Sequence, residues 1–461
     1  MKSRQPVVTV LGHVDHGKTT LLDAIRQTSV AQREAGGITQ SIGASVVSAD
    51  GKKITFIDTP GHAIFSQMRS RGAKVADIAV LVVAADDGIK PQTSEAISHI
   101  REAKIPFVVA ITKTDLPAAN PESVLGQLEK EQIFFEGRGG DTPYILVSAK
   151  AGKGIAELLE IINLVAEVNE IKADEAAELE AVVIETGKGK GGPTVSVIVR
   201  NGVLEKGMML SCEEIVAKVK AIFEDKGKQV SRVLPGEPAL ILGFSDLPPV
   251  GAVVRPDHGR SLQDLKKKEY KRGKIKKGEV PLVIKTASTG VLEAISASLP
   301  KGIITILSGV GEVTESDVFA AKSANADYIF AFKTKTSSGV SRLAETEGIK
   351  IKNFDVVYEL LQDAEELISK EEEIVLGRAK ILASFPFNNR KVAGGKIIDG
   401  KFTKADKFVL MRQDKEIGRA KAASFQKGKE EAFEAKEGEE FGIILAPQLD
   451  FKEGDMILSV K

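Results

Sequence analysis

The sequence predicts an α/β multidomain protein with a parallel-sheet domain, a β-barrel, a small α/β layer domain, a long helix and a second β-barrel. Three observations support this prediction. From Val7 to about Glu170, apolar runs rich in β-branched residues alternate with helical segments, as in a parallel sheet covered by helices. A strand, a glycine-rich loop and a helix open that region. Two later stretches, 181–254 and 377–461, share one layout of short strands and turns, which indicates two copies of a small antiparallel barrel.

The composition of the chain restricts the class of protein but does not indicate a binding partner. The 461 residues are enough for three or four domains, and the 64 basic residues balance 64 acidic ones, so net charge indicates no ligand. One cysteine, Cys212, excludes a disulfide framework and suits a reducing compartment. The longest apolar run, Ile78 to Ala85, is too short to span a bilayer, and no signal peptide precedes the first strand. We therefore expect a soluble cytoplasmic protein with no membrane partner.

The first strand, at Val7 to Val10, leads into a phosphate-binding loop of the form Gly-x-x-x-x-Gly-Lys-Thr and then into a helix. Backbone N–H groups of such a loop surround phosphates, and the helix N-terminus favours an anion. Lys18 is expected to reach the outer phosphates and the Thr19 hydroxyl to hold Mg²⁺. The expected nucleotide contacts in this loop are Gly12, His13, Val14, Asp15, His16, Gly17, Lys18, Thr19 and Thr20.

The rest of the first domain, residues 1–172, supplies four further motifs. Its later strands are expected at Lys53–Ile57, Ile78–Ala84, Ile105–Ile111 and Tyr144–Val147, with helices such as Thr93–Ala103 and Ile155–Val168 between them. The motifs are Ala35-Gly36-Gly37-Ile38-Thr39, Asp58-Thr59-Pro60-Gly61-His62, Thr112-Lys113-Thr114-Asp115 and Ser148-Ala149-Lys150. Ligands of parallel sheets bind at the carboxyl ends of strands, where these four motifs are expected to fall.

Each motif has an expected role. Asp58 can hold the Mg²⁺ shell through water, and Thr39 is a candidate second metal ligand. Asp115 can accept two N–H bonds from guanine and none from adenine, while Ser148, Ala149 and Lys150 close the purine pocket. Together with the first loop, the motifs predict a P-loop GTPase domain that binds GTP and Mg²⁺.

These residues also carry a family resemblance. Gly12–Thr19 together with Asp58–His62 resembles the translational GTPases, and the stretch Ala35–Ala44 narrows the resemblance to bacterial translation initiation factor 2, over essentially the whole chain. The resemblance implies that His62 orients the attacking water, although a histidine packed at a helix start is the alternative. It also implies that Val14 and Ile38 gate that histidine and that Asp15 can bind a monovalent cation.

Two departures from the family are visible. The base-reading loop usually begins with asparagine and here begins with Thr112, so affinity for guanine is expected to fall while Asp115 keeps the selectivity. The long N-terminal region of bacterial members is also expected to be absent, because Val7 already opens the first strand. The other histidines, His13, His16, His99 and His258, show no metal-ligand spacing in the sequence.

The remaining domains follow in order. We expect a β-barrel at 178–258, an α/β/α domain at 279–355, a connecting helix at 356–374 and the terminal barrel at 375–461. In the first barrel, Val195–Val199 and Met208–Leu210 are predicted to form a hairpin through Asn201-Gly202. The lysine-rich segment from Arg260 to Lys277 is either a solvated linker or an RNA-facing helix.

The resemblance implies that the terminal barrel holds the acceptor end and formyl-methionine of initiator tRNA. The family motif Ala-Gly-Cys stands here as Ala393-Gly394-Gly395, and Glu-Cys-Gly stands as Glu440-Phe441-Gly442. We expect Gly395 and Phe441 to rebuild the pocket for the methionyl group, with weaker discrimination for the formyl group. Phe425, Lys427 and Lys429 are candidates for stacking on bases and for binding phosphates.

The leading functional prediction is a monomeric GTPase that brings initiator tRNA to the small ribosomal subunit and promotes subunit joining, with hydrolysis stimulated by the ribosome. One alternative is another tRNA-carrying translational GTPase. The other is a nucleotide-gated RNA-binding or assembly switch with little turnover.

Overall fold

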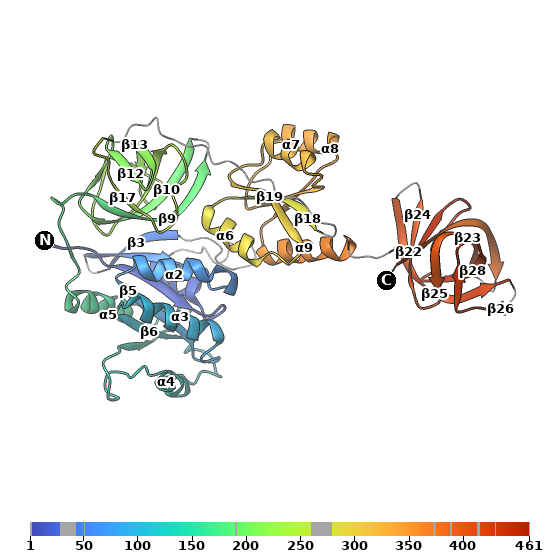
Figure 1. The fold of residues 1–461 in the computed structure, drawn as a ribbon. Helices are drawn as coiled ribbons and strands as arrows, with labels where there is room; N and C mark the ends of the chain where they lie inside the picture. Colours follow the sequence, from blue (N-terminus) through green and yellow to red (C-terminus); the bar gives the residue numbers. More distant parts are fainter. Residues whose placement is uncertain are drawn as a thin grey trace. The chain divides into compact units, whose positions relative to one another are not determined.

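The computed structural model describes residues 2–27, 43–49, 51–189, 191–259, 279–371, 375–387, 390–412, 415–428 and 430–460. The chain divides into two compact units, one that extends to Ala364 and one that begins at Glu365 (Figure 1). A parallel-sheet domain, two barrels and a smaller α/β domain are all present, so the predicted fold class is confirmed. No helix among the described residues is long and apolar enough to cross a bilayer.

The first domain is built on a six-stranded sheet with the order β3-β4-β2-β5-β6-β7. Its strands are β2 (Val7–Gly12), β3 (Gly43–Ala49), β4 (Lys52–Asp58), β5 (Ile78–Ala84), β6 (Phe107–Thr112) and β7 (Tyr144–Leu146). Its helices are α1 (Lys18–Arg26), α2 (Ser66–Val75), α3 (Pro91–Ala103), α4 (Pro121–Lys130) and α5 (Ile155–Val168), with a short 3₁₀ helix η2 (Ala63–Phe65) before α2. The pair β1 (Lys2–Ser3) and β8 (Lys172–Ala173) joins the two ends of the domain.

The sheet is parallel except at one edge, where β3 pairs with β4 in antiparallel fashion. β3 was not predicted, because its small and polar residues form no apolar run. Both faces of the sheet are buried, which explains the continuous apolar strands. On one face, alternate residues of β2 and β5 pack with α1 and α5: Val8, Val10, Val80, Val82, Leu21, Leu22, Leu158 and Ile162. On the other they pack with α3 and α4: Leu11, Leu81, Val83, Ile97, Ile100, Val124 and Leu128.

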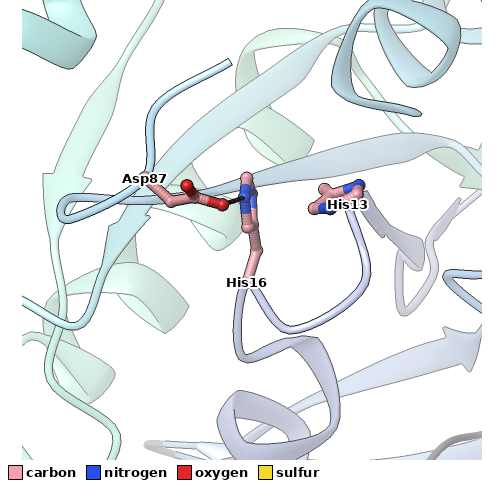
Figure 2. A group of neighbouring side chains, drawn as sticks. All are labelled: His13, His16 and Asp87. Carbon is pink, nitrogen blue, oxygen red and sulfur yellow. Dashed lines mark hydrogen bonds and ion pairs between the residues drawn. The ribbon is translucent and has the colours of Figure 1, made fainter. Parts of the chain in front are cut away.

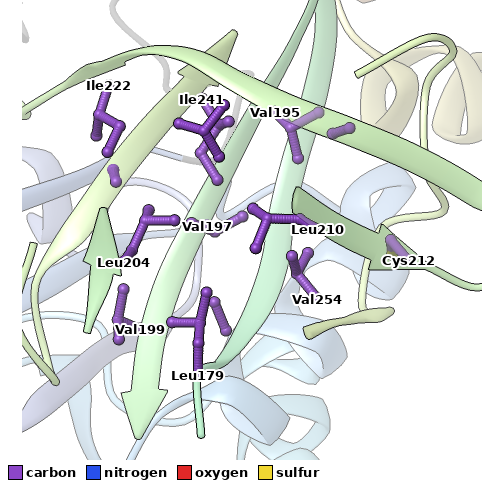
Figure 3. Close-up of a cluster of buried hydrophobic side chains, with 14 of the residues drawn as sticks. Leu179, Val195, Val197, Val199, Leu204, Leu210, Cys212, Ile222, Ile241 and Val254 are labelled. Carbon is purple, nitrogen blue, oxygen red and sulfur yellow. The ribbon is translucent and has the colours of Figure 1, made fainter. Parts of the chain in front are cut away.

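The second domain is an antiparallel barrel with the order β12-β17-β9-β10-β16-β13-β14, and pairing of β12 with β13 closes it. Its strands are β9 (Glu180–Gly189), β10 (Gly192–Asn201), β11 (Leu204–Glu205), β12 (Met209–Cys212), β13 (Ile215–Phe223), β14 (Gln229–Val230), β15 (Arg232–Val233), β16 (Pro238–Phe244) and β17 (Val253–Pro256). Inward-facing aliphatic side chains from these strands meet in one core, as Figure 3 shows.

The predicted hairpin in this barrel is wrong. β10 pairs with β9 and β16, whereas β12 pairs with β13 and β17. Asn201-Gly202 instead turns the chain into β11, which pairs with β15. Gly202 has φ 66°, and a Cβ there would lie 2.7 Å from the backbone of Ala177 and Leu179. The glycine is therefore required by close backbone approach rather than by a two-residue hairpin.

The third domain contains a four-stranded sheet with the order β19-β18-β20-β21. Its strands are β18 (Val280–Thr286), β19 (Ile303–Val310), β20 (Tyr328–Phe332) and β21 (Lys350–Phe354), and its helices are α6 (Thr289–Ser298), α7 (Glu315–Ser323) and α8 (Ser338–Thr346). α7 starts with a capping box, in which Thr314 N donates to Asp317 Oδ2 at 2.8 Å. α9 (Val357–Glu371) follows β21.

The terminal barrel has the order β22-β29-β24-β25-β28-β23-β27, and β22 also pairs with β23. Its strands are β22 (Val375–Phe387), β23 (Arg390–Thr403), β24 (Lys407–Arg412), β25 (Lys415–Lys427), β26 (Glu430–Glu431), β27 (Glu434–Lys436), β28 (Glu440–Ala446) and β29 (Met456–Val460). Five phenylalanines belong to its core: Phe402, Phe408, Phe425, Phe441 and Phe451. This core is therefore rich in aromatic rings, whereas the core of the second domain's barrel is mainly aliphatic and includes one phenylalanine, Phe244.

Candidate functional site

A cavity of about 360 Å³ lies at the carboxyl ends of the first domain's strands. It brings together three of the predicted motifs and the phosphate-binding loop. Its lining residues are Val14, Asp15, Gly17, Lys18, Thr19, Thr20, Gly61, His62, Thr112, Lys113, Asp115, Leu116, Ala149 and Lys150. Leu116 was not predicted, because an apolar residue after a polar loop gives no signal in the sequence.

The cavity lining leaves out eight of the predicted nucleotide-binding residues. Gly12, His13, His16, Asp58, Thr59, Pro60, Thr114 and Ser148 are not among the lining residues. Thr39, together with Ile38, lies outside the described residues.

The phosphate-binding loop has the backbone conformation that its glycines predict. Gly12 has φ 149°, and a Cβ there would collide with the carbonyl of Val82 on the neighbouring strand. Gly17, with φ 86°, is the N-cap of α1. Both positions favour glycine for conformational reasons, and Gly12 also for close backbone approach. The loop therefore places the N-terminus of α1 at the cavity.

Lys18 is the cation at the base of this cavity. Its side chain is 6% exposed, and its Nζ donates to the backbone carbonyl of His13. Burial lowers the pKa of Lys18 to about 8, against the attraction of the Asp58 carboxylate. A phosphate anion beside Lys18 would favour its charged form, because an opposite charge at close range raises the pKa of a lysine.

Asp58 ends β4 and is buried, with a side-chain oxygen 3.8 Å from Nη1 of Arg26. The next residue, Thr59, fixes this strand end, since its hydroxyl donates to the carbonyl of Val10 at 2.8 Å. The β4 end is therefore tied to β2, from which the phosphate-binding loop starts.

The base-reading loop is held by hydroxyl groups. Ser148 Oγ donates to Asp115 Oδ1 at 2.7 Å, and this hydrogen bond lowers the pKa of the Asp115 carboxyl. Thr112 Oγ1 donates to the carbonyl of His16 at 2.6 Å, and Thr114 Oγ1 to the carbonyl of Val147 at 3.1 Å. Thr112 is 2% exposed, and its hydrogen bond to His16 connects this loop to the phosphate-binding loop.

His62 precedes η2 and is half-buried at the cavity. Burial lowers its pKa, and the positive charge of Arg69 adds to the effect. Arg69 is fully buried and donates to three carbonyls of this turn: those of Pro60 at 3.2 Å, His62, and Ala63 at 3.5 Å. Its other partner is Glu95, whose two carboxylate oxygens are each 2.8 Å from Nη2. One guanidinium thus holds the backbone around His62.

The structure brings two other histidines of the chain close to an acidic residue. His13, His16 and Asp87 offer ligand atoms that all lie within 4.8 Å of one another (Figure 2). His16 is 1% exposed, burial lowers its pKa to about 4, and its Nε2 lies 3.4 Å from Asp87 Oδ2. The contact between His16 and Asp87 connects the phosphate-binding loop to the segment that follows β5.

One predicted contact in the terminal barrel is wrong. Phe425 is 0% exposed and stacks on Phe441, with ring centroids 5.5 Å apart, so it cannot stack on a base. Phe441 is also buried, and a Cβ added at Gly395 would lie 2.9 Å from its ring. The phenylalanine therefore fills the space that the glycine leaves. Lys427 is half-exposed and pairs with Glu439 at 2.5 Å, while Lys429 and the segment from Arg260 to Lys277 lie outside the described residues.

Three family models match successive parts of the chain. The Elongation factor Tu GTP binding domain matches residues 3–168, Elongation factor G domain 2 matches residues 178–255, and Translation-initiation factor 2 matches residues 254–365. A protein named Translation initiation factor IF-2 from Caldanaerobacter subterraneus is 40% identical over 99% of this chain and 69% of its own length. The chain belongs to the translation initiation factor IF-2 family.

Other IF-2 proteins extend well beyond the matched region. The relative from Nitratiruptor sp. is 39% identical, and this chain spans 59% of its length. Among solved structures, the crystal structure of GDP-bound aIF5B from Aeropyrum pernix matches with 27% identity and a TM-score of 0.47, and covers 99% of this chain and 92% of its own.

Proposed function

We propose that this chain is a GTP-hydrolysing translation initiation factor that promotes initiator tRNA binding to the small ribosomal subunit and subunit joining. The observation that carries the proposal is the cavity shared by Lys18, His62 and Asp115, in a chain of the IF-2 family. In this cavity, the Lys18 ammonium would contact phosphate, the His62 ring would orient water and the Asp115 carboxylate would bind guanine. These are the groups that binding and hydrolysis of GTP need.

Nucleotide binding follows from the two ends of the cavity. At one end, the loop from Gly12 to Thr20 and the N-terminus of α1 would bind the phosphates, with Lys18 at the outer ones. At the other, Asp115 would accept two N–H bonds from guanine, held in orientation by Ser148. The hydrogen bond from Thr112 to the carbonyl of His16 would hold the two ends of the cavity in a fixed position relative to each other.

The donor set beside the phosphates fits Mg²⁺. The Thr19 hydroxyl and the Asp58 carboxylate are hard oxygen ligands, which Mg²⁺ prefers. Bound there, Mg²⁺ would neutralise charge on the outer phosphates. Thr39 remains a proposed second ligand, and Asp15, which lines the cavity, a proposed contact for a monovalent cation.

Hydrolysis itself requires a positioned water and stabilised charge. Because burial lowers its pKa, His62 is neutral at pH 7 and can orient water through a ring nitrogen. Val14 lies at the same cavity and would limit access to that histidine. Lys18 would stabilise the negative charge that develops on the leaving phosphates.

The proposed partners are both ribosomal subunits and initiator tRNA, with the factor acting as a monomer. The experiment that tests the function is GTP turnover by the full chain, with and without 70S ribosomes. We expect turnover to rise strongly when ribosomes are added. A chain that binds GTP but shows no ribosome-stimulated turnover would instead be a nucleotide-gated switch.

In the terminal barrel, we predict weak discrimination between formylated and unformylated methionyl-tRNA. Phe441 stands where the family motif has the smaller cysteine, and its ring occupies the space beside Gly395. A pocket difference of one small group is worth about 1–3 kcal/mol, or about 10- to 200-fold. Binding of the full chain to both tRNA forms measures the preference. A preference for the formylated form of a hundredfold or more would show that the rebuilt pocket still recognises the formyl group.

A further inference from the structure

The candidate histidine has a partner from a distant part of the chain. Tyr358, on the first turn of α9, hydrogen-bonds through its hydroxyl to Nδ1 of His62. The two rings also pack edge to face, with centroids 4.3 Å apart and an interplanar angle of 61°. We propose that Tyr358 is a positioning residue for GTP hydrolysis that fixes the ring of His62. This inference rests on the water-orienting role proposed for His62.

The chemistry of imidazole explains what this contact does. A hydrogen bond at one ring nitrogen sets the orientation of the ring and leaves the other nitrogen for the reacting group. With Nδ1 engaged by Tyr358, Nε2 is the nitrogen left for water. Since Arg69 holds only the backbone around His62, the side-chain orientation needs a separate partner. Tyr358 supplies it.

The helix that carries Tyr358 is itself fixed. Val357, Leu360 and Ala364 are fully buried at helical spacing, so one face of α9 packs against the body of the same compact unit. Lys352 on β21 forms an ion pair with Asp363 on α9 at 2.6 Å. Tyr358 lies off this buried face and is 40% exposed, so its ring is available to the first domain.

The third domain is held beside the same turn by a second set of contacts. Glu185 on β9 accepts hydrogen bonds from Gly290 N at 3.1 Å and from Ser288 Oγ at 3.0 Å, at the start of α6. Arg71 on α2 forms an ion pair with Glu293 on α6 at 2.6 Å. These contacts place α6 against α2, the helix that follows His62, and so support the position from which α9 presents Tyr358.

The test is Tyr358→Phe in the full chain, which keeps the ring and removes the hydroxyl. We expect ribosome-stimulated kcat to fall by about 2- to 12-fold, the rate equivalent of one hydrogen bond, with KM for GTP unchanged. Tyr328→Phe is the matched control, since it removes a hydroxyl from the sheet of the same domain, where Tyr328 packs on Phe330. Its kcat should equal that of the wild type.

A double-mutant cycle separates positioning from a purely structural role. In a His62→Ala background, Tyr358→Phe should cause no further loss, because the group it positions is gone. An equal loss in both backgrounds would overturn the proposal, and so would an unchanged kcat in the single variant. A rise in turnover without ribosomes would also overturn it, since Tyr358 would then restrain His62. A wild type without stimulated turnover would refute the proposed function as well, whereas a normal wild type beside an unaffected variant would refute the positioning role alone.

Discussion

Replacing His62 by alanine is expected to lower ribosome-stimulated GTP hydrolysis by about 10²- to 10⁵-fold, the range for a positioned group at this step. GTP affinity should remain close to that of the wild type. The proposed phosphate end of the cavity is lined by the loop with Lys18 and the proposed base end by Asp115, and neither end needs the imidazole of His62. Single-turnover hydrolysis on 70S ribosomes, with GTP binding measured separately, would distinguish the two effects.

His258→Ala is a suitable control for that experiment. His258 is exposed in the second domain and pairs with Glu178 at 2.5 Å, away from the cavity residues. It should turn over GTP at the wild-type rate. If His62→Ala also stayed within a factor of a few of the wild type, His62 would be a packing residue at the start of η2.

The cavity was predictable because its motifs stand at strand ends. A run such as Ile54–Ile57 predicts a buried strand from local residues alone, and parallel strands end at one edge of the sheet. Lys18, Asp58 and Asp115 can therefore be assigned to one edge of the sheet from the sequence alone. Gly12 was predictable for a similar reason, since the loop conformation is local.

The predictions that were wrong concern strand pairing and the face of a strand on which a side chain lies. Asn201-Gly202 resembles a hairpin turn, yet the partner of β10 is the distant β16. Phe425 was expected to stack on a base, but its position in β25 directs it into the aromatic core. His16 and Asp87 meet only because β2 and β5 are neighbours in the sheet. Contacts of this kind have no local signal.

Asp115→Asn is expected to reverse the nucleotide preference of the full chain. The wild-type carboxylate is proposed to accept two N–H groups of guanine, and each hydrogen bond to a charged group is worth about 1.5–3 kcal/mol, so GTP affinity should fall roughly 10²- to 10⁴-fold. Xanthosine triphosphate carries a carbonyl at purine position 2, where guanine carries an amino group. The asparagine amide can donate to that carbonyl, so the variant should bind xanthosine triphosphate better than GTP.

Asp141→Asn provides the matched control, because Asp141 is an exposed carboxylate of the same domain that does not line the cavity. It should keep the wild-type order of GTP over ATP and xanthosine triphosphate in competition binding.

The hydrogen bond from Ser148 to Asp115 allows a milder test of the same role. Ser148→Ala leaves the carboxylate in place but loses its orienting donor, so GTP affinity should fall by about tenfold without a change in preference. Equal affinity of the wild type for ATP and GTP would show that Asp115 does not read the base.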